Sequence, residues 1–337
     1  MLIQQVKTIS DLAGLLGTRE KHLTSLKPEE MYITFQIPKP GKTEKRTIET
    51  PDVRLKPLLG RLANSLQDAY TQHKTLAAYG FVRSHEHDPD RRNIYTNATK
   101  HLGCKYLVNM DFDEFFYQID KQKLELLFND FSLFDMLPET EKYITSLVTY
   151  KGRLPMGSPT SPPLSNLATI LLDNELLLWC KFNGITYTRY VDDMSFSSDN
   201  PISGRHIEKM KEIMWSHRFV VDEKKTKIFG KNDVKIITGL IVNKKILIPD
   251  DFINDFEACL HKLADMHAFA AQFPESSVFE WLAQMQRNMQ GRLAFVGFVY
   301  GKNSPLFLKL KKQLASVNMA SEIEESISWR YAGYEIH

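Results

Sequence analysis

The order of hydrophobic and polar positions divides the chain of 337 residues into three parts. Up to residue 105, two runs with helical spacing surround two alternating, strand-like runs joined by a Pro-Gly turn. In chain order these segments are 8–30, 32–37, 38–42, 46–51 and 53–73. Strand-like and helix-like runs alternate over residues 105–245, and helical spacing returns after Pro249. The pattern predicts a strand-rich chemical domain whose flanking parts hold a long ligand.

The segment Tyr190-Val191-Asp192-Asp193 lies inside a hydrophobic, aromatic run, and we expect it at the tip of a hairpin. Each of two adjacent carboxylates raises the pKa of the other. A divalent cation removes this cost, and Mg²⁺ prefers hard oxygen ligands that it shares with phosphates. The segment therefore indicates half of a metal site; read alone, it is equally compatible with a solvated turn.

A second acidic turn follows the strand-like run Tyr106-Leu107-Val108, and Asp111 lies where that strand ends. A sheet that places Asp111 beside Asp192 and Asp193 would surround two cations with three carboxylates. Two-metal displacement at a phosphate needs this arrangement, because one cation activates the attacking oxygen and the other stabilises the leaving oxygen.

Three other segments bear on chemistry, each with a plain structural alternative. Residues 155–163 combine Gly, Ser, Thr and Pro before a helix, so their backbone can approach an anion or a sugar; the alternative is a structural loop. Residues 224–227 place lysines where a departing diphosphate would need charge or a proton; the alternative is a solvated turn. Residues 236–242 predict a buried strand whose glycine marks a bulge or a close backbone approach.

Charge and cysteine content narrow the class of protein. The net charge is only +2, but residues 1–105 hold 17 Lys and Arg against 11 Asp and Glu. This excess predicts a basic surface for a phosphate backbone, or simply a solubilising face. The three cysteines lie far apart, which argues against a disulfide framework and fits a reducing compartment. Since no hydrophobic run reaches membrane-spanning length, we expect a soluble, cytoplasmic protein without a membrane partner.

Taken together and in this order, the segments resemble the motifs of reverse transcriptases. Those similar to the four palm motifs are Asp111 with Phe115-Phe116, residues 155–159, residues 190–193 and residues 222–226. Thr238-Gly239-Leu240 resembles the strand that supports the primer end, and Arg46-Thr47-Ile48 and Tyr79-Gly80-Phe81 resemble the fingers. The resemblance implies an α+β right-hand polymerase. Its parts would be fingers (1–104), a palm with an antiparallel sheet and a fingers insertion (105–248, insertion at about 120–155), and a helical thumb with a tail (249–337).

The bacterial retron subgroup fits best. Residues 97–101 match its Asn-Ala-x-x-His element, and Ile237-Thr238-Gly239 stands where retrons usually carry Val-Thr-Gly. Met156 departs from the family, which commonly has Gln there, beside the incoming nucleotide. The subgroup implies a cognate structured non-coding RNA that is both template and primer, priming from an RNA 2′-hydroxyl, and an RNA–DNA hybrid product. It also implies a separate effector protein and a role in antiphage defence.

The resemblance assigns roles to particular residues. It implies two Mg²⁺ ions held by Asp111, Asp192, Asp193 and the main-chain carbonyl of Phe112, and it makes Lys225 the acid for the departing pyrophosphate. For the dNTP it implies contacts with the triphosphate, the base or the sugar by Lys45, Arg46, Phe112, Phe116, Met156 and Gly157, with Phe116 excluding the 2′-hydroxyl. For the RNA and the primer it implies Tyr79, Gly80, Phe81, Asn97, His101, Tyr190, Thr238 and Gly239, with a buried structural role as the alternative for Asn97 and His101.

Two other functions stay open from the sequence. One is a non-retron defence or abortive-infection polymerase, which would lack the branched RNA-linked product. The other is a non-catalytic RNA-binding scaffold, against which the intact acidic trio argues.

Overall fold

The computed structural model describes residues 2–38, 44–84, 88–130, 132–272 and 278–317. The chain forms two compact units, the first made of Met1–Arg83 and Cys104–Asp233, the second of Ser84–Gly103 and Val234–His337. Each unit is therefore built from two separate stretches of sequence.

The first unit begins with short helices rather than with one long run. The helical spacing over residues 8–30 is divided between α1 (Ile9–Leu15) and α2 (Glu20–Thr24). Gly17 lies between them with φ +62°, a left-handed conformation that ends a helix and favours glycine. Leu12 of α1 and Leu23 of α2 are buried and Leu15 is partly buried, so the spacing located the hydrophobic face but not the break.

The predicted hairpin is present as β1 (Tyr32–Pro38) and β2 (Lys45–Pro51), which pair antiparallel. Its predicted turn falls largely on residues 39–43, outside the described residues. The helix α3 (Lys56–His73) follows, and its leucines lie in the hydrophobic core of this unit. The helices α5 (Lys121–Phe128) and α6 (Pro138–Val148) contact each other nearby, and α7 (Ser161–Ala168) packs on α3.

A four-stranded antiparallel sheet forms the centre of the first unit, with the strand order β4-β5-β3-β6. Its strands are β3 (Tyr106–Asp111), β4 (Thr186–Tyr190), β5 (Asp193–Ser198) and β6 (Lys227–Phe229). Tyr187 and Phe196 are cross-strand partners whose rings stack at 4.8 Å. Such pairs fix the register of a sheet.

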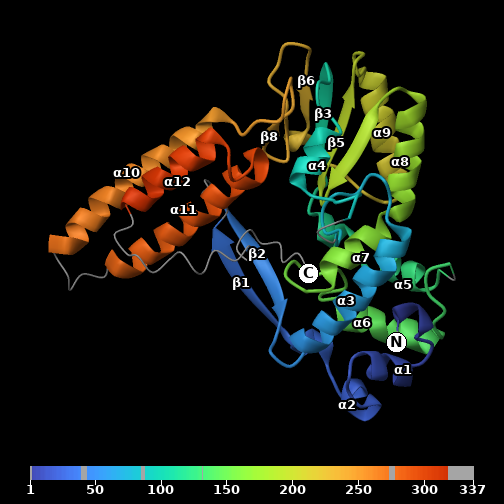
Figure 1. Cartoon of the computed structure of the whole chain (residues 1–337). Coiled ribbons are helices and arrows are strands. Elements are labelled where there is room, and N and C mark those ends of the chain that lie inside the picture. Colours follow the sequence, from blue (N-terminus) through green and yellow to red (C-terminus); the bar gives the residue numbers. More distant parts are fainter. Residues whose placement is uncertain (1, 39–43, 85–87, 131, 273–277, 318–337) are drawn as a thin grey trace. The chain divides into compact units, whose positions relative to one another are not determined.

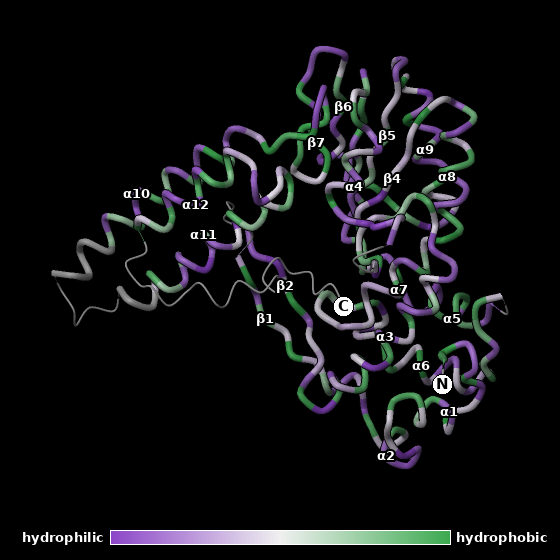
Figure 2. The backbone as a smooth tube through the Cα atoms, viewed as in Figure 1, coloured by the Kyte–Doolittle hydropathy of each residue, from purple (hydrophilic) through white to green (hydrophobic). Residues whose placement is uncertain are grey.

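The helices α8 (Ile170–Phe182) and α9 (Gly204–Ser216) cover one face of this sheet (Figure 1). Met194 and Phe196 of β5 share one buried core with Leu172 of α8 and Met214 of α9. Hydrophobic and hydrophilic residues alternate along both helices (Figure 2), as expected for helices with one buried side. Removing the Phe196 ring would cost about 3–5 kcal/mol.

The second unit contains α4 (Ile94–Thr99), the short strands β7 (Ile236–Ile237) and β8 (Leu240–Ile241), and three further helices. The helices α10 (Asp250–Gln272), α11 (Val278–Tyr300) and α12 (Pro305–Val317) contact one another, as the helical spacing after Pro249 predicted. The prediction of one strand over residues 236–242 is wrong. Thr238 (φ +46°) and Gly239 (φ +82°) turn the chain back, and the two halves pair as a tight hairpin.

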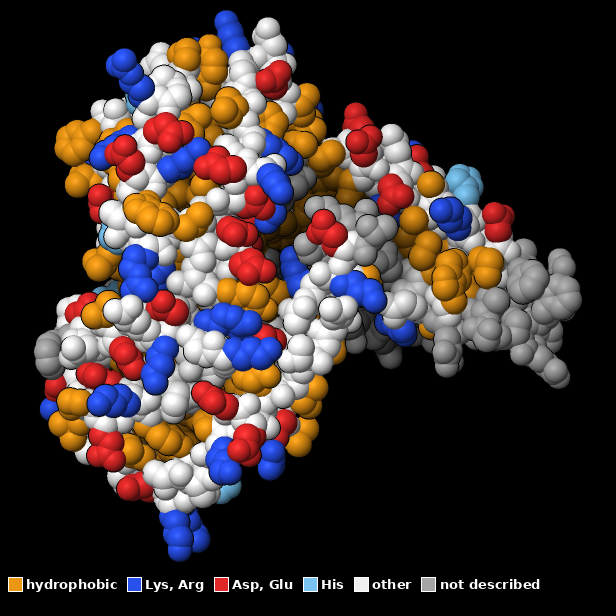
Figure 3. Space-filling model, turned by 180° about the vertical axis from the view of Figure 1, so that it is seen from behind, with side chains coloured by type: hydrophobic (Ala, Val, Ile, Leu, Met, Phe, Trp, Pro, Cys, Tyr) orange, Lys and Arg blue, Asp and Glu red, His pale blue; other side chains and the backbone are white. Residues whose placement is uncertain are grey.

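Three of the broad expectations, on disulfides, on membrane-spanning helices and on a basic surface, can be compared with the structure. All three cysteines are free, which confirms that the chain has no disulfide framework. Among the described residues, no helix combines the length and hydrophobicity needed to cross a bilayer. On the face seen in Figure 3, Lys and Arg alternate with Asp and Glu, so the described residues form no extended basic patch on that face.

Candidate active site

The four-stranded sheet brings the three predicted acidic residues together at one end. Asp111 is the last residue of β3 and lies opposite Asp193, the first residue of β5. Asp192 precedes β5, and its carbonyl accepts a hydrogen bond from the main-chain N–H of Phe112 at 3.2 Å. Two segments far apart in the chain therefore meet here because of the antiparallel register of β3 and β5.

The carboxyl groups of Asp192 and Asp193 resist ionisation in this arrangement. Burial and then the charge of Asp111 raise the pKa of Asp192. The pKa of Asp193 is raised to about 7 by burial, by the charge of Asp192, and by a hydrogen bond and the charge of Asp111. The side chain of Asp193 is exposed to solvent, so the charges of its carboxylate neighbours contribute more to the raised pKa than burial does. The site therefore lacks positive charge.

Lys225 supplies part of that charge. Its Nζ lies 2.5 Å from Oδ1 of Asp111 and 3.7 Å from Oδ2 of Asp222. Burial opposes protonation of this lysine, but the hydrogen bond to Asp111 and the surrounding carboxylates outweigh burial and raise its pKa. The Lys225 side chain is half exposed, so the contact is open to solvent. The lysine predicted to act on a phosphate is thus charged and adjacent to the acidic trio.

The residues present fit a divalent cation by their chemistry. Asp111, Asp192 and Asp193 offer hard oxygen donors, and a bound divalent cation would relieve the repulsion between carboxylates that, after burial, raises the pKa of the last two. Asp111 is turned toward Lys225, and within the described chain no group of three or more His, Cys, Asp or Glu side chains is arranged to hold a metal ion as it stands. The three carboxylates therefore suit a metal ion by their chemistry, while in this structure the Asp111 carboxylate contacts the ammonium of Lys225.

The residues predicted to bind the nucleotide approach the acidic trio from β2 and from the loop before α7. Arg46 is exposed on β2, and its charge is among those that lower the pKa of Asp192, so it lies within electrostatic reach of the carboxylates. Lys45 is its exposed neighbour. The carbonyl of Met156 accepts a hydrogen bond from the N–H of Glu49 at 2.8 Å. Gly157 has φ +130°, and a Cβ there would lie 2.8 Å from Ile48 Cγ2, so the loop and β2 touch at a point where only glycine fits.

The aromatic residues after Asp111 form a stack beside the site. Phe112 is buried and lies 5.1 Å from the ring of Phe115. The ring of Phe116 is partly exposed and lies 5.6 Å from Phe115 and 6.2 Å from Phe81. Phe116 therefore has aromatic support from the buried ring of Phe115 and the partly buried ring of Phe81, and its own ring stays partly exposed, which suits a steric gate.

The residues predicted to contact the primer or the RNA are divided between the two units. In the first unit, the N–H of Tyr79 donates to the carbonyl of Arg189 at 2.8 Å, which ties residues 79–81 to the end of β4, where Tyr190 pairs with Asp193. Tyr79 is buried. Thr238 and Gly239 form the hairpin turn of the second unit, where Thr238 Oγ1 donates to the carbonyl of Ile94 at 3.1 Å.

Asn97 and His101 also belong to the second unit, and both are about 1% exposed. Burial lowers the pKa of His101 to about 3, so its imidazole is neutral at physiological pH. Their burial favours the alternative, a structural pair, over direct contact with RNA.

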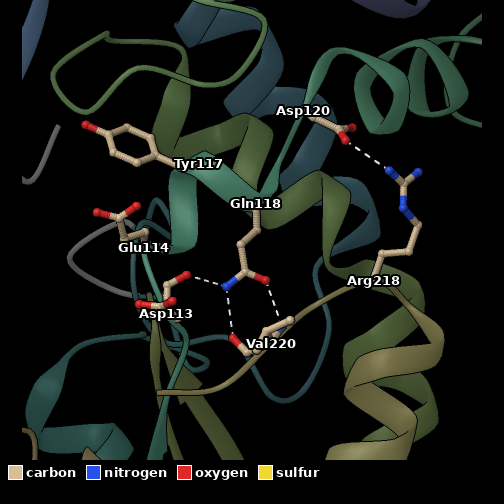
Figure 4. Close-up of a pocket in the computed structure, with 7 residues that line it drawn as sticks. All are labelled: Asp113, Glu114, Tyr117, Gln118, Asp120, Arg218 and Val220. Carbon is tan, nitrogen blue, oxygen red and sulfur yellow. Dashed lines mark hydrogen bonds and ion pairs between the residues drawn. The ribbon is translucent and has the colours of Figure 1, made fainter. Parts of the chain in front are cut away.

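A pocket of about 430 Å³ opens beside the turn that follows Asp111. Figure 4 shows Gln118 inside it, bridging to the main chain of Asp113 and Val220, and an ion pair of Asp120 with Arg218 at 2.9 Å. Asp113 and Glu114 add two more carboxylates to its walls. The surplus of negative charge repels a triphosphate, so we do not assign the nucleotide to this pocket.

The sequence reasoning missed a buried polar group beneath the turn at residues 190–193. Arg189 and Asp173 are both fully buried and form a two-pronged ion pair at 2.9 and 2.7 Å. Asn166, in α7, is also fully buried and contacts Arg189. The sequence offered one signal of this pair: Asp173 and Arg189 are charged residues inside hydrophobic runs, where a charge is rarely found unless it is paired.

Comparison with known proteins gives one family and several relatives. Residues 37–242 match the family described as reverse transcriptase (RNA-dependent DNA polymerase). The Retron Ec86 reverse transcriptase of Escherichia coli is 27% identical over 259 residues, covering 75% of each chain. The Retron Mx162 reverse transcriptase of Myxococcus xanthus is 27% identical over 262 residues, covering 68% of this chain and 52% of that relative. The structure of apo telomerase from Candida tropicalis aligns with a TM-score of 0.47 and 12% identity. This alignment covers 87% of this chain and 65% of the telomerase chain.

Proposed function

Since this chain belongs to the reverse transcriptase family, as a retron-type member, we propose that it copies a structured non-coding RNA into DNA. The predicted activity, RNA-directed DNA polymerase, and the predicted α+β right-hand polymerase fold are both confirmed by the family match. Enzymes of this family use divalent metal ions. The division into fingers, palm and thumb at residues 104 and 248 is part of the proposal.

The single observation that carries the proposal is the meeting of Asp111 and Asp193 in register, with Asp192 beside them. These carboxylates, with the main-chain carbonyl of Phe112, would hold two Mg²⁺ ions. When bound, the metal activates the primer hydroxyl and stabilises the leaving oxygen. The polypeptide contributes by fixing the donors at the end of a rigid sheet.

Other residues of the site handle the nucleotide. Arg46 and Lys45 neutralise the triphosphate, and the backbone at Met156 and Gly157 lies against the base and sugar. Phe116 occupies the space that a 2′-hydroxyl would need, so deoxynucleotides are preferred. Lys225 balances the charge of the departing pyrophosphate and donates its proton to it. Its raised pKa keeps the amine protonated until that step, and its half-exposed side chain can reach a phosphate.

The nucleic-acid partner is a cognate RNA that serves as template and primer. Priming from an RNA 2′-hydroxyl would give single-stranded DNA linked to RNA, held as an RNA–DNA hybrid, with a cytoplasmic role in antiphage defence beside a separate effector protein. Tyr79, Gly80, Phe81 and Tyr190 in the first unit, and Thr238 and Gly239 in the second, are the proposed contacts to the RNA and the primer end. Support comes from the retron relatives, which are 25–30% identical to this chain.

Primer extension on an RNA template with Mg²⁺ tests the proposal. Asp192→Asn removes a metal ligand and should lower DNA synthesis by at least roughly a thousandfold, because metal stabilisation of the transition state amounts to several kcal/mol. Asp199→Asn is the matched control, since Asp199 is an exposed aspartate just after β5. Activity of Asp192→Asn within a few-fold of that control would reject the site.

Sequencing the nucleic acid that co-purifies with the protein tests the RNA partner. Branched DNA of one sequence, joined to one RNA, is the expected result. DNA without a linked RNA would instead indicate a non-retron defence polymerase, and RNA without DNA synthesis would indicate a scaffold.

A further inference from the structure

Asn166 of α7 is fully buried, and its side-chain amide joins two turns of the first unit. Nδ2 donates to the carbonyl of Gly80 at 3.0 Å and to that of Phe81 at 3.2 Å. Oδ1 accepts from both terminal nitrogens of Arg189 at 3.3 Å. Every one of these contacts reaches a residue next to the candidate site rather than another part of the core.

The Arg189 side of this contact leads to the acidic turn. Arg189 donates to the carbonyl of Val191 at 2.9 Å and to Oγ1 of Thr169 at 2.7 Å, while Asp173 balances its charge. Val191 has φ +62°, a conformation that is a true outlier for a β-branched residue. Such backbone persists only where its surroundings hold it. Arg189 therefore holds the turn that presents Asp192.

The Gly80 side leads to the aromatic stack. A Cβ on Gly80 would lie 2.6 Å from Val191 Cγ2 and 2.7 Å from Val191 N, so the two turns are in contact. Phe81 also has a left-handed backbone, at φ +56°, and its ring lies 6.2 Å from that of Phe116. The Asn166 amide thus contacts the carbonyl of Phe81, one of the two strained residues. It also contacts the Arg189 guanidinium, which holds the other strained residue, Val191.

Building on the proposed function, we propose that Asn166 is a positioning residue that couples metal binding to sugar selection. Its amide fixes the Phe81 backbone that supports the Phe116 gate, and through Arg189 it fixes the turn that bears Asp192 and Asp193. A loss of this amide leaves buried carbonyls and a guanidinium N–H without partners. Both turns then relax together, so metal binding and sugar selection change together. Loss of an asparagine with a merely structural role would change neither metal binding nor sugar selection.

The decisive variant is Asn166→Ala, measured in the full chain. Mn²⁺ binding to the metal-free protein, followed by electron paramagnetic resonance, should weaken roughly tenfold, the factor for one lost hydrogen bond to a charged group. The preference for dNTP over rNTP in primer extension should fall by a similar factor. Ser65→Ala is the matched control, because Ser65 is buried and accepts a long-range backbone hydrogen bond from Ile3, a contact that involves neither of these turns.

Two further variants separate the effect on metal binding from the effect on sugar selection. Thr169→Val removes one acceptor of Arg189, together with the bonds of the hydroxyl to the carbonyls of Ser165 and Asn166 within the helices, and leaves the contacts of Asn166 with residues 80 and 81 in place. Mn²⁺ binding should therefore weaken several-fold while sugar preference stays within twofold of wild type. Asn166→Asp keeps the acceptor for Arg189 but loses the donor to residues 80 and 81, so sugar preference should fall more than Mn²⁺ affinity. This second variant also carries the test if Asn166→Ala fails to fold.

The proposal is overturned if Asn166→Ala and Asn166→Asp match Ser65→Ala in both Mn²⁺ affinity and sugar preference. Phe116→Ala distinguishes this failure from failure of the proposed function. If Phe116→Ala relaxes sugar preference while the Asn166 variants do not, the gate stands and the coupling is wrong. If Phe116→Ala changes nothing, the gate itself is wrong.

Discussion

The ionisation of Asp193 predicts a pH-dependent stability for the metal-free protein. Its pKa is about 7 in the folded chain and near 3.8 when unfolded, so the folded state binds the proton more tightly. Stability from this group is therefore complete below about pH 4 and is lost as the pH rises to 7. In EDTA at pH 8, Asp193→Asn should melt at a higher temperature than wild type.

The pH series provides the control for this prediction. The difference in melting temperature should shrink as the pH falls from 8 to 4, and Mn²⁺ at pH 8 should stabilise wild type more than Asp193→Asn. A difference that is constant across this range would show that the raised pKa is not what limits stability.

Phe116 carries the second prediction at this scale. Its ring has a partly exposed edge supported by Phe115 and Phe81. Phe116→Ala should raise the efficiency of ribonucleotide incorporation by roughly 10–100-fold, a range typical of discrimination by pocket shape. Single-nucleotide extension with matched dNTP and rNTP measures it, with Leu126→Ala, an exposed leucine of α5, as a control for general damage. An unchanged ratio would remove Phe116 from nucleotide selection.

At the scale of elements, one buried ion pair joins β2 to the loop that carries Gly157. Arg153 contacts both carboxylate oxygens of Glu49 at 2.8 and 3.0 Å, and Glu49 is about 1% exposed. The guanidinium also lies 3.6 Å above the ring of Tyr117. This pair aligns the strand of Arg46 with the loop, so its loss should weaken dNTP binding as well as stability.

Arg153→Leu leaves the carboxylate of Glu49 buried with only Lys151, at 3.7 Å, to balance it. We expect a loss of about 3 kcal/mol in the free energy of unfolding. The double variant Glu49→Leu with Arg153→Leu should recover part of that loss, because no uncompensated charge remains buried. Urea denaturation of the four proteins measures this; a double variant less stable than either single variant would contradict it.

The sequence predicts the elements that follow one clear period and misses those decided by contacts elsewhere. The hairpin of β1 and β2 and the strands ending at Asp111 and Tyr190 agree with their alternation. The break at Gly17 and the turn at Thr238 depend on left-handed backbone, which a hydrophobic spacing does not encode. Asn166 was hidden because a buried polar residue has the same period as its hydrophobic neighbours.

The candidate site shows the same division. The acidic trio was predictable because a second acidic residue, Asp111, follows another strand-like run, and a cation would offset the repulsion among the three carboxylates. The contact of Lys225 with Asp111 required the folded chain, because 114 positions separate the two residues. The support from Arg189 required it as well, because the sequence does not show that this guanidinium is buried and directed at the carbonyl of Val191. The spacing also gives no hint that Asn97 and His101 are buried.

For the whole molecule, the distribution of charge bears on how strongly RNA binding depends on salt. The net charge is +2, and charges of both signs alternate on the face in Figure 3. Binding should still depend on salt, because phosphates are the main ligand of the polypeptide. Between 50 and 200 mM KCl, the affinity for the cognate RNA should fall by roughly tenfold or more. Filter binding measures this, with Asp192→Asn expected within threefold of wild type; an equal loss in that variant would assign the carboxylate to RNA binding.

The contact of Lys225 with Asp111 spans 114 positions of the chain, and this has a consequence for synthesis on the ribosome. Asp111 emerges long before its lysine has been translated, and β6, which completes the sheet beside β3, comes later still. A chain that ends between Asp111 and Asp192 carries Arg46 and the first carboxylate but lacks the other two, and a chain that ends between Asp193 and Lys225 lacks the lysine and β6. Interrupted translation therefore yields silent products instead of an unregulated polymerase.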